Sequence, residues 1–178
     1  VKQTIDKLSA GLIRLGVSGN DMRIENQDKI ALISKNRPEW LMLDMACQQI
    51  GVAICPIYPT TNVKELEFIF NDASVKHVFV SGQEILDKVL AVRNNVPTLQ
   101  NIYSFDELPD SINWKILLEN ISADDQAGME KVKATIKAEH SATIIYTSVT
   151  TGTPKAVMLS HRNIVTNVIN SKKTFPFT

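Results

Sequence analysis

Apolar and polar residues alternate along the first part of the chain in two ways, one typical of helices and the other of buried strands. Residues 1–16 repeat apolar side chains at helical spacing and end on Gly16, which suits the position just after a helix. The segment Ile30-Ala-Leu-Ile-Ser34 is almost wholly apolar, as in a strand buried on both faces of a sheet. Pro38 then predicts the first turn of a second helix, which ends near Gly51.

The same alternation continues further along the chain. Apolar runs predict three more strands, at residues 52–56, 75–80 and 98–103. The helices between them are expected to begin at Asn62 and Ser81, each followed three residues later by a glutamate, in the pattern of a capping box. Strands and helices that alternate with short connections favour an α/β fold, a doubly wound and mostly parallel sheet with flanking helices and right-handed crossovers.

The next stretch, residues 104–140, is more polar and less periodic. We predict one helix near Trp114 and a mobile or helical linker over residues 124–137. The pair Asp124-Asp125 fits either two metal ligands or the acidic first turn of a helix. The helix start is favoured, because adjacent acids complement the positive end of a helix dipole.

Two apolar runs near the end of the chain, residues 142–147 and 156–159, predict a strand hairpin with a loop at 148–155. Ser160 suits the N-cap of a final helix over residues 162–173. The expected organisation is therefore alternating strand and helix units at 1–103, a polar linker region at 104–140, and the hairpin with its following helix at 141–178.

The composition of this hairpin loop suits a site that binds polyphosphate. It combines hydroxyl side chains, one flexible glycine, one rigid proline and one cation. These residues are Ser148, Thr150, Thr151, Gly152, Thr153, Pro154 and Lys155. Backbone N–H groups and hydroxyls can surround anionic oxygens, and the ammonium adds a point charge. The spacing is not that of a Walker A loop, whose lysine opens a helix. On composition alone, a threonine-rich hairpin without a ligand is the alternative.

The charge and the cysteine content of the chain exclude some classes of protein. The 19 basic and 19 acidic side chains cancel, so no overall field attracts nucleic acid. No run is long enough for a transmembrane helix and no leader is present, so we expect a cytoplasmic protein and leave peripheral membrane contact open. The two cysteines, Cys47 and Cys55, lie in apolar segments and are expected to be buried, inert thiols, and His77 is expected to be structural.

The stretch Tyr146-Thr-Ser-Val-Thr-Thr-Gly-Thr-Pro-Lys-Ala-Val-Met-Leu-Ser-His-Arg-Asn163 resembles the phosphate-loop signature of the adenylate-forming (AMP-binding) superfamily, and most closely that of long-chain fatty-acid–CoA ligases. Two positions depart from it, because Val149 and Ala156 stand where the family has glycine. Other segments resemble the same family in the same order along the chain, at residues 36–40, 51–60 and 133–137. Within the second, Tyr58-Pro59 is favoured as a structural turn over a substrate contact.

This resemblance implies that the chain is the N-terminal part of an acyl-CoA synthetase. The parent would activate a fatty acid with Mg²⁺ and ATP to an acyl-adenylate and then transfer it to CoA. The residues implied to bind the ATP phosphates are Thr147, Ser148, Val149, Thr150, Thr151, Gly152, Thr153, Pro154 and Lys155. No catalytic residue and no metal ligand is expected among these 178 residues, and the C-terminal domain is expected to be absent.

A start at Val1, already within helical periodicity, is typical of a chain cut from a longer protein. We therefore expect this chain alone to be inactive and to self-associate through apolar surface on its last helix, near Ile164 and Val168. Two alternatives stay open. The chain can belong to a non-catalytic or degenerate relative, with Val149 as the discriminating feature, or to an enzyme that adenylates another carboxylic acid.

Overall fold

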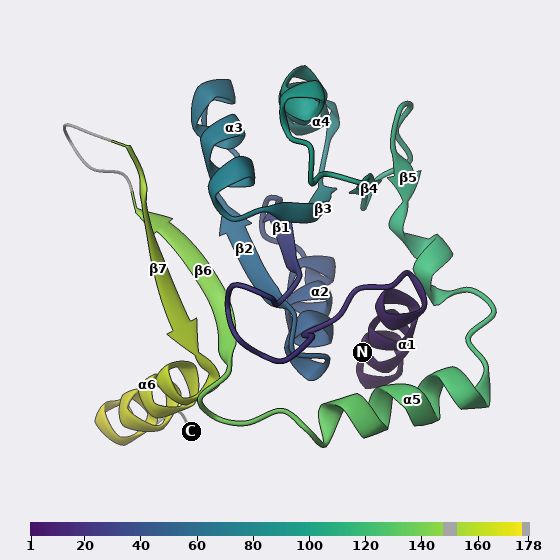
Figure 1. The fold of residues 1–178 in the computed structure, drawn as a ribbon, viewed down its shortest axis with the longest axis vertical. Coiled ribbons are helices and arrows are strands. Elements are labelled where there is room, and N and C mark those ends of the chain that lie inside the picture. Colours follow the sequence, from purple (N-terminus) through teal and green to yellow (C-terminus); the bar gives the residue numbers. More distant parts are fainter. Residues whose placement is uncertain (148–152, 176–178) are drawn as a thin grey trace.

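A computed structural model describes residues 1–147 and 153–175, which form a mixed, mostly parallel sheet flanked by helices (Figure 1). The seven strands lie in the order β5-β4-β3-β1-β2-β6-β7, and only β6 and β7 pair antiparallel. The strands are β1 Lys29–Ile33, β2 Ala53–Ile57, β3 Val75–Val80, β4 Asn101–Ser104, β5 Ile112–Asn113, β6 Ser141–Thr147 and β7 Lys155–Ser160. The predicted α/β fold class is confirmed.

Helices cover both faces of the sheet. They are α1 Lys2–Arg14, α2 Pro38–Gln49, α3 Val63–Asp72, α4 Gln83–Val92, α5 Ala123–Lys133 and α6 His161–Thr174, with short 3-10 helices η1 Arg93–Asn95 and η2 Trp114–Leu118. Helices α1, α2 and α5 pack on one face together with η2, while α3 and α4 pack on the other. No helix of the described residues is long and apolar enough to cross a bilayer.

Most helix ends lie where the sequence predicts them. Gly16 has a positive φ of 85°, and the Val17 N–H donates to the Leu12 carbonyl at 3.0 Å, which closes the turn after α1. Pro38 occupies the first turn of α2. The Asn62 side chain accepts from the Glu65 N–H at 3.0 Å at the start of α3.

The predicted N-cap at Ser81 is wrong. Helix α4 begins at Gln83, and its N-cap residue is Gly82, whose φ is 77°. Ser81 lies one residue too early, where its hydroxyl oxygen accepts from the Lys35 N–H at 3.3 Å. Its side chain therefore connects the ends of β1 and β3 instead of capping the helix.

Strand β4 also begins later than predicted, at Asn101 instead of residue 98. The Leu99 N–H donates to the Val96 carbonyl at 3.1 Å, so the chain is still turning at that point. The β-branched Thr98 and the apolar Leu99 lie in a tight turn, which their propensity for strands does not reveal.

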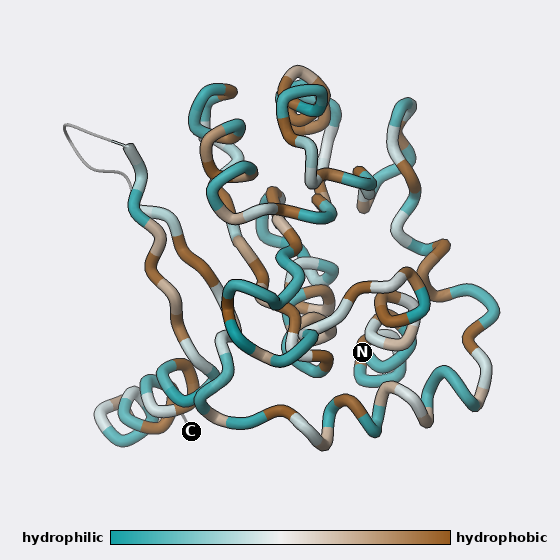
Figure 2. Tube along the Cα trace, in the orientation of Figure 1, coloured by the Kyte–Doolittle hydropathy of each residue, from teal (hydrophilic) through white to brown (hydrophobic). Residues whose placement is uncertain are grey.

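Residues 104–140 contain regular structure. Trp114 lies in η2, a 3-10 helix, and its side chain is buried. In α5, Ser122 and Asp125 form a reciprocal capping box, so the acidic pair begins a helix as favoured. In Figure 2 hydrophobic and hydrophilic positions alternate along α5, and Met129 is its one buried side chain. Among the described residues, no group of three or more His, Cys, Asp or Glu could hold a metal ion.

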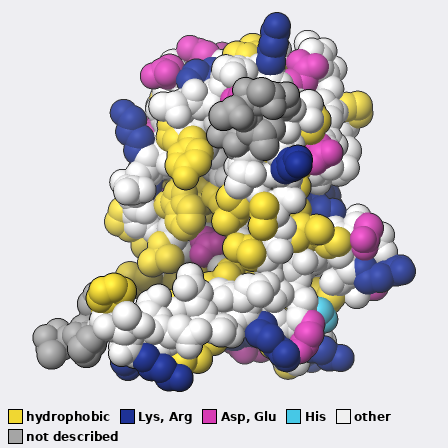
Figure 3. Space-filling view, turned by 90° about the vertical axis from the view of Figure 1, so that its left-hand side faces the viewer, with side chains coloured by type: hydrophobic (Ala, Val, Ile, Leu, Met, Phe, Trp, Pro, Cys, Tyr) yellow, Lys and Arg dark blue, Asp and Glu magenta, His cyan; other side chains and the backbone are white. Residues whose placement is uncertain are grey.

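The predicted hairpin and final helix are confirmed, and they lie at one side of the molecule. Strands β6 and β7 lean away from β2 toward the hairpin tip, and α6 lies across their base (Figure 1). Figure 3 shows apolar side chains gathered on this side. We call this apolar set the hairpin–α6 surface, and its exposed members are Val157, Met158, Val165, Val168 and Ile169.

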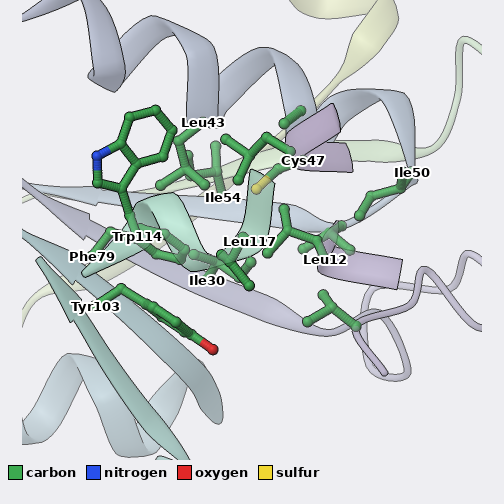
Figure 4. Packing of buried hydrophobic residues seen from close by; sticks show 14 of the residues in the cluster. Leu12, Ile30, Leu43, Cys47, Ile50, Ile54, Phe79, Tyr103, Trp114 and Leu117 are labelled. Atoms are coloured by element: carbon green, nitrogen blue, oxygen red, sulfur yellow. The ribbon is translucent and has the colours of Figure 1, made fainter. Parts of the chain in front are cut away.

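Two hydrophobic clusters lie on opposite faces of the sheet. The first includes the stacked rings of Phe79 and Tyr103, whose centroids are 4.8 Å apart, and it is shown in Figure 4. Cys47 belongs to this cluster and Cys55 to the other, and both thiols are free and buried, as predicted. Burial raises the pKa of Cys55 to about 12 and raises that of Cys47 as well, so both stay protonated and unreactive.

His77 is fully buried in β3, in agreement with a structural role. Burial lowers its pKa to about 4, with a further decrease from the charge of Lys76. Its Nε2 has no hydrogen-bond partner among the described residues, and its Nδ1 lies 3.4 Å from the amide nitrogen of Asn101. The folded chain therefore holds a neutral imidazole.

This imidazole predicts a pH dependence of stability. Below an unfolded-state pKa of about 6.5, the unfolded chain binds a proton that the folded chain excludes, so the free energy of unfolding decreases as pH falls. We expect His77 to account for a loss of about 2 kcal/mol between about pH 7 and about pH 5. Urea unfolding across this range should show a steeper pH dependence for the unmodified chain than for His77→Leu. Parallel curves would contradict the prediction.

Candidate functional site

The carboxyl ends of the parallel strands lie at one edge of the sheet, where each strand is followed by a loop. Helix α2, which follows β1, and helix α4, which follows β3, lie on opposite faces, so their loops separate next to the central strand β1. Ligands of doubly wound folds usually bind at such a point. A cavity of about 440 Å³ opens there, the switch-point crevice, and its lining includes Lys35, Arg37, Thr60, Gly82 and Asp106.

Arg37 connects the two sides of this crevice. Its guanidinium donates to Glu39 Oε2 and to Asp106 Oδ1, both at 2.9 Å, and lies 5.3 Å from the centre of the Phe105 ring. The second oxygen of Asp106 accepts from the Gly82 N–H at 2.9 Å. Hydrogen bonds to Glu39 and then Asp106 raise the pKa of Arg37. Arg37 therefore holds the two sides of the crevice in place, and it belongs to segment 36–40, which resembles the family.

Sequence reasoning missed Asp106. Burial tends to raise its pKa, but the hydrogen bond from Arg37 lowers it below the ordinary value, so the carboxylate is charged. Its partner lies 69 positions earlier in the chain. An aspartate that stands next to Glu107 in a loop gives no sequence signal for such a contact.

A second cavity, of about 490 Å³, lies between the ends of β1 and β2 and the hairpin. Trp40, Tyr58 and Ile145 are among its lining residues. The Tyr58 carbonyl accepts from the Thr61 N–H at 3.0 Å, so Tyr58-Pro59 does form a turn at the strand exit. Tyr58 is nevertheless 77% exposed.

The hairpin brings the two ends of the predicted phosphate loop together. Thr147 pairs with Lys155 across β6 and β7, and the Thr147 hydroxyl lies 3.4 Å from the Lys155 carbonyl oxygen. Thr153 and Lys155 are exposed, and Pro154 is half-buried. The other predicted residues, Ser148, Val149, Thr150, Thr151 and Gly152, lie outside the described residues. Binding of phosphate by the loop stays a prediction.

The end of the motif has a structural role. Ser160 is the N-cap of α6, as predicted, and forms a reciprocal capping box with Asn163. The His161 N–H donates to the His140 carbonyl at 3.1 Å, and Arg162 forms an ion pair with Glu139. These contacts attach the base of the hairpin to the segment that precedes it.

The sequence profile of the AMP-binding enzyme family matches residues 1–178, the whole of the chain. The chain belongs to this family. Among curated relatives of this AMP-binding chain, the peroxisomal long chain acyl-CoA synthetase 6 of Arabidopsis thaliana is 29% identical over 177 residues, which is 96% of this chain and 24% of that protein. Fatty acyl-CoA synthetase A of Dictyostelium discoideum is 29% identical over 171 residues, 92% of this chain and 24% of that protein. The AMP-binding chain thus spans about a quarter of the length of these relatives.

Solved structures show the same fold in the family. The long-chain-fatty-acid-CoA ligase FadD1 of Archaeoglobus fulgidus matches with a TM-score of 0.74 and 22% identity, over 96% of this chain and 30% of that one. The acetoacetyl-CoA synthetase of Streptomyces lividans matches with a TM-score of 0.75 and 21% identity, over 93% of this chain and 25% of that one. The AMP-binding fold of this chain is therefore shared by enzymes named for different acids.

Proposed function

We propose that this chain supplies the phosphate-binding part of a long-chain fatty-acid–CoA ligase, an acid–thiol ligase. The observation that carries the proposal is the hairpin, which places Lys155 and Thr147 side by side at the ends of the signature loop. The curated relatives that match over nearly the whole chain are named for long-chain acids, which supports this substrate class. The expected site of action is the cytoplasm, although the Arabidopsis relative is named as peroxisomal.

The proposed reaction has two steps. A carboxylate oxygen of the fatty acid attacks the α-phosphorus of ATP, which enters as its Mg²⁺ salt, and the bond to the β-phosphate oxygen breaks to release pyrophosphate. The CoA thiol then attacks the acyl carbonyl, its proton is lost, and AMP leaves. Residues 147–155 would hold the β- and γ-phosphates, where the Lys155 ammonium offsets the charge that develops on the leaving pyrophosphate.

The experiment that tests this function is ATP–pyrophosphate exchange by the full-length protein that contains this chain. We expect exchange that depends on a saturated fatty acid and is greatest for long chains. Exchange only with aryl, amino or short-chain acids would replace the proposed substrate class. No exchange with any acid would favour the degenerate relative.

Val149 bears directly on the alternative that the protein is a degenerate relative. Glycine in a phosphate loop usually permits a positive φ or close approach to the anion, and a β-branched residue in such a conformation costs ~1 to 3 kcal/mol. We expect Val149→Gly in the full-length protein to increase pyrophosphate exchange ~10- to 100-fold. The matched variant Val157→Gly lies on the exposed part of β7 and should give no increase. Equal rates for Val149→Gly and the unmodified protein would remove the main argument for degeneracy.

We also propose that the 178-residue chain, on its own, is inactive and self-associates through the hairpin–α6 surface. Val168 is 62% exposed and Met158 is 55% exposed, and exposed apolar side chains gathered on one side of a molecule favour association. Light scattering should show a mass above that of a monomer, which Val168→Glu reduces. A monodisperse monomer at high concentration would contradict the prediction.

A further inference from the structure

A third cavity, of about 330 Å³, lies on the α3 side of the hairpin. Its lining includes Asp72 at the end of α3 and Tyr146, the first residue of the signature stretch. The Tyr146 hydroxyl donates to Asp72 Oδ2 at 2.6 Å. The rings of Tyr146 and Phe68 also form a T-shaped pair, with centroids 6.5 Å apart and planes at 89°. Because Phe68 and Asp72 are four positions apart, both contacts come from one side of α3.

The hydrogen bond is short and joins a half-buried phenol to an exposed carboxylate. Its acceptor is a carboxylate, and charge-assisted O–H···O contacts are shorter and stronger than neutral ones. Burial raises the pKa of Tyr146, and the neighbouring Asp72 raises it further, so the hydroxyl keeps its proton throughout the physiological range. The phenol therefore acts as a permanent donor.

This contact adds to the limited strand pairing between β6 and the rest of the sheet. Strand β6 pairs with β2 only at Thr143, opposite Ile54. Among the described residues, 144–147 of β6 pair with β7 alone. Figure 1 shows the hairpin leaning away from β2 beyond that point. The Tyr146–Asp72 bond thus connects the outer half of the hairpin to the helical layer.

The register of β6 and β7 places this contact next to the proposed phosphate site. Tyr146 pairs with Ala156, and the adjacent pair is Thr147 with Lys155. A shift of the Tyr146 side chain from Asp72 would therefore move the backbone that holds the Lys155 ammonium. Losing an ångström of alignment at a binding group can reduce rates substantially.

We propose that Tyr146 is a positioning residue whose hydroxyl, held by Asp72, sets the place of Lys155 for ATP binding. This inference rests on the proposed function. It assigns to Asp72, a helix residue outside the signature, a role in substrate affinity that acts through the hairpin.

The test uses the full-length protein with Tyr146→Phe, Asp72→Ala and Asp72→Asn. Tyr146→Phe and Asp72→Ala should each raise KM for MgATP ~3- to 10-fold and leave KM for the fatty acid unchanged. The double variant Tyr146→Phe/Asp72→Ala should show no larger effect than either single variant, because both remove one bond. Asp72→Asn keeps an acceptor oxygen and should retain most of the affinity.

The matched control is Tyr103→Phe, which removes a phenol oxygen that has no side-chain hydrogen bond within the described part of the chain. It should leave both KM values unchanged. An unchanged KM for MgATP in Tyr146→Phe would overturn the proposal, and so would additive effects in the double variant. A general loss, with both KM values and thermal stability altered together, would show a merely structural role and would also overturn it.

A second measurement separates this inference from the proposed function. If the unmodified full-length protein forms no acyl-adenylate, the proposed function fails, and amide hydrogen exchange then decides the positioning claim. Tyr146→Phe should speed exchange at residues 155–157 of β7 and leave β1 unaffected. Unchanged exchange at residues 155–157 would overturn it.

Discussion

Gly11→Ala is expected to destabilise this chain by about 2 to 4 kcal/mol, although alanine is the better helix former. Gly11 lies in the C-terminal half of α1, on the buried side that faces η2. A Cβ at this position would lie 1.9 Å from the carbonyl oxygen of Leu117 and 2.9 Å from its carbonyl carbon. Backbone atoms cannot rotate away as a side chain can, so α1 or η2 would have to move and loosen the packing between them.

Gly128→Ala is the matched control. This glycine also lies inside a helix, α5, but a Cβ there would meet no atom within 4 Å. The same substitution should therefore stabilise the chain by ~0.5 to 1 kcal/mol, because it restricts the unfolded backbone and favours the helix. Urea unfolding followed by circular dichroism measures both. Equal signs for the two variants would show that close approach at Gly11 is not what requires glycine.

Lys155→Met is expected to lower kcat/KM for adenylation in the full-length protein ~100- to 1000-fold. Methionine keeps a stem of similar length and removes the only cation of the signature loop, so the charge developing on pyrophosphate loses its partner. The Lys155 side chain is exposed at the start of β7, and the fold should not depend on it. Initial rates of fatty acid-dependent pyrophosphate release measure the effect.

The control for Lys155 is Lys115→Met. Lys115 is an exposed lysine in η2, away from the hairpin, and its side chain has no ion pair among the described residues. Its loss should change the rate less than ~2-fold. A Lys155→Met protein that retained the full rate would show that the loop does not stabilise the leaving group, and would count against the proposed phosphate site.

The features predicted correctly from the sequence are those that a local pattern determines. A continuous apolar run is a central strand because both of its faces must be buried, as in β1, where all five residues are buried. Gly16 and Pro38 mark helix ends because glycine tolerates the positive φ that follows α1, and proline fixes the φ of a first helical turn. Helix α5 was harder to predict from the sequence, because Met129 is its one buried residue and its apolar residues show only weak helical periodicity.

The features that could not be predicted depend on contacts between distant positions. Asp106 meets Arg37 across 69 positions, and Tyr146 meets Asp72 across 74. Each acid stands beside one other polar residue, in Asn71-Asp72 and Asp106-Glu107, where an aspartate is ordinary. Ser81 was misplaced for a similar reason, because its contact with Lys35 depends on β1 and β3 being neighbours in the sheet. The signature loop was found because its residues match a family motif in order over a short stretch.

The two buried cysteines give the chain a built-in probe on each side of its sheet. Cys47 lies with α1, α2 and α5, and Cys55 lies with α3 and α4. A thiol reagent can reach either one only when the layer above it opens, so the two alkylation rates measure the opening of the two layers separately. Equal rates would mean that both layers separate from the sheet in a single event. A faster rate at Cys47 would mean that the layer containing Gly11 opens first.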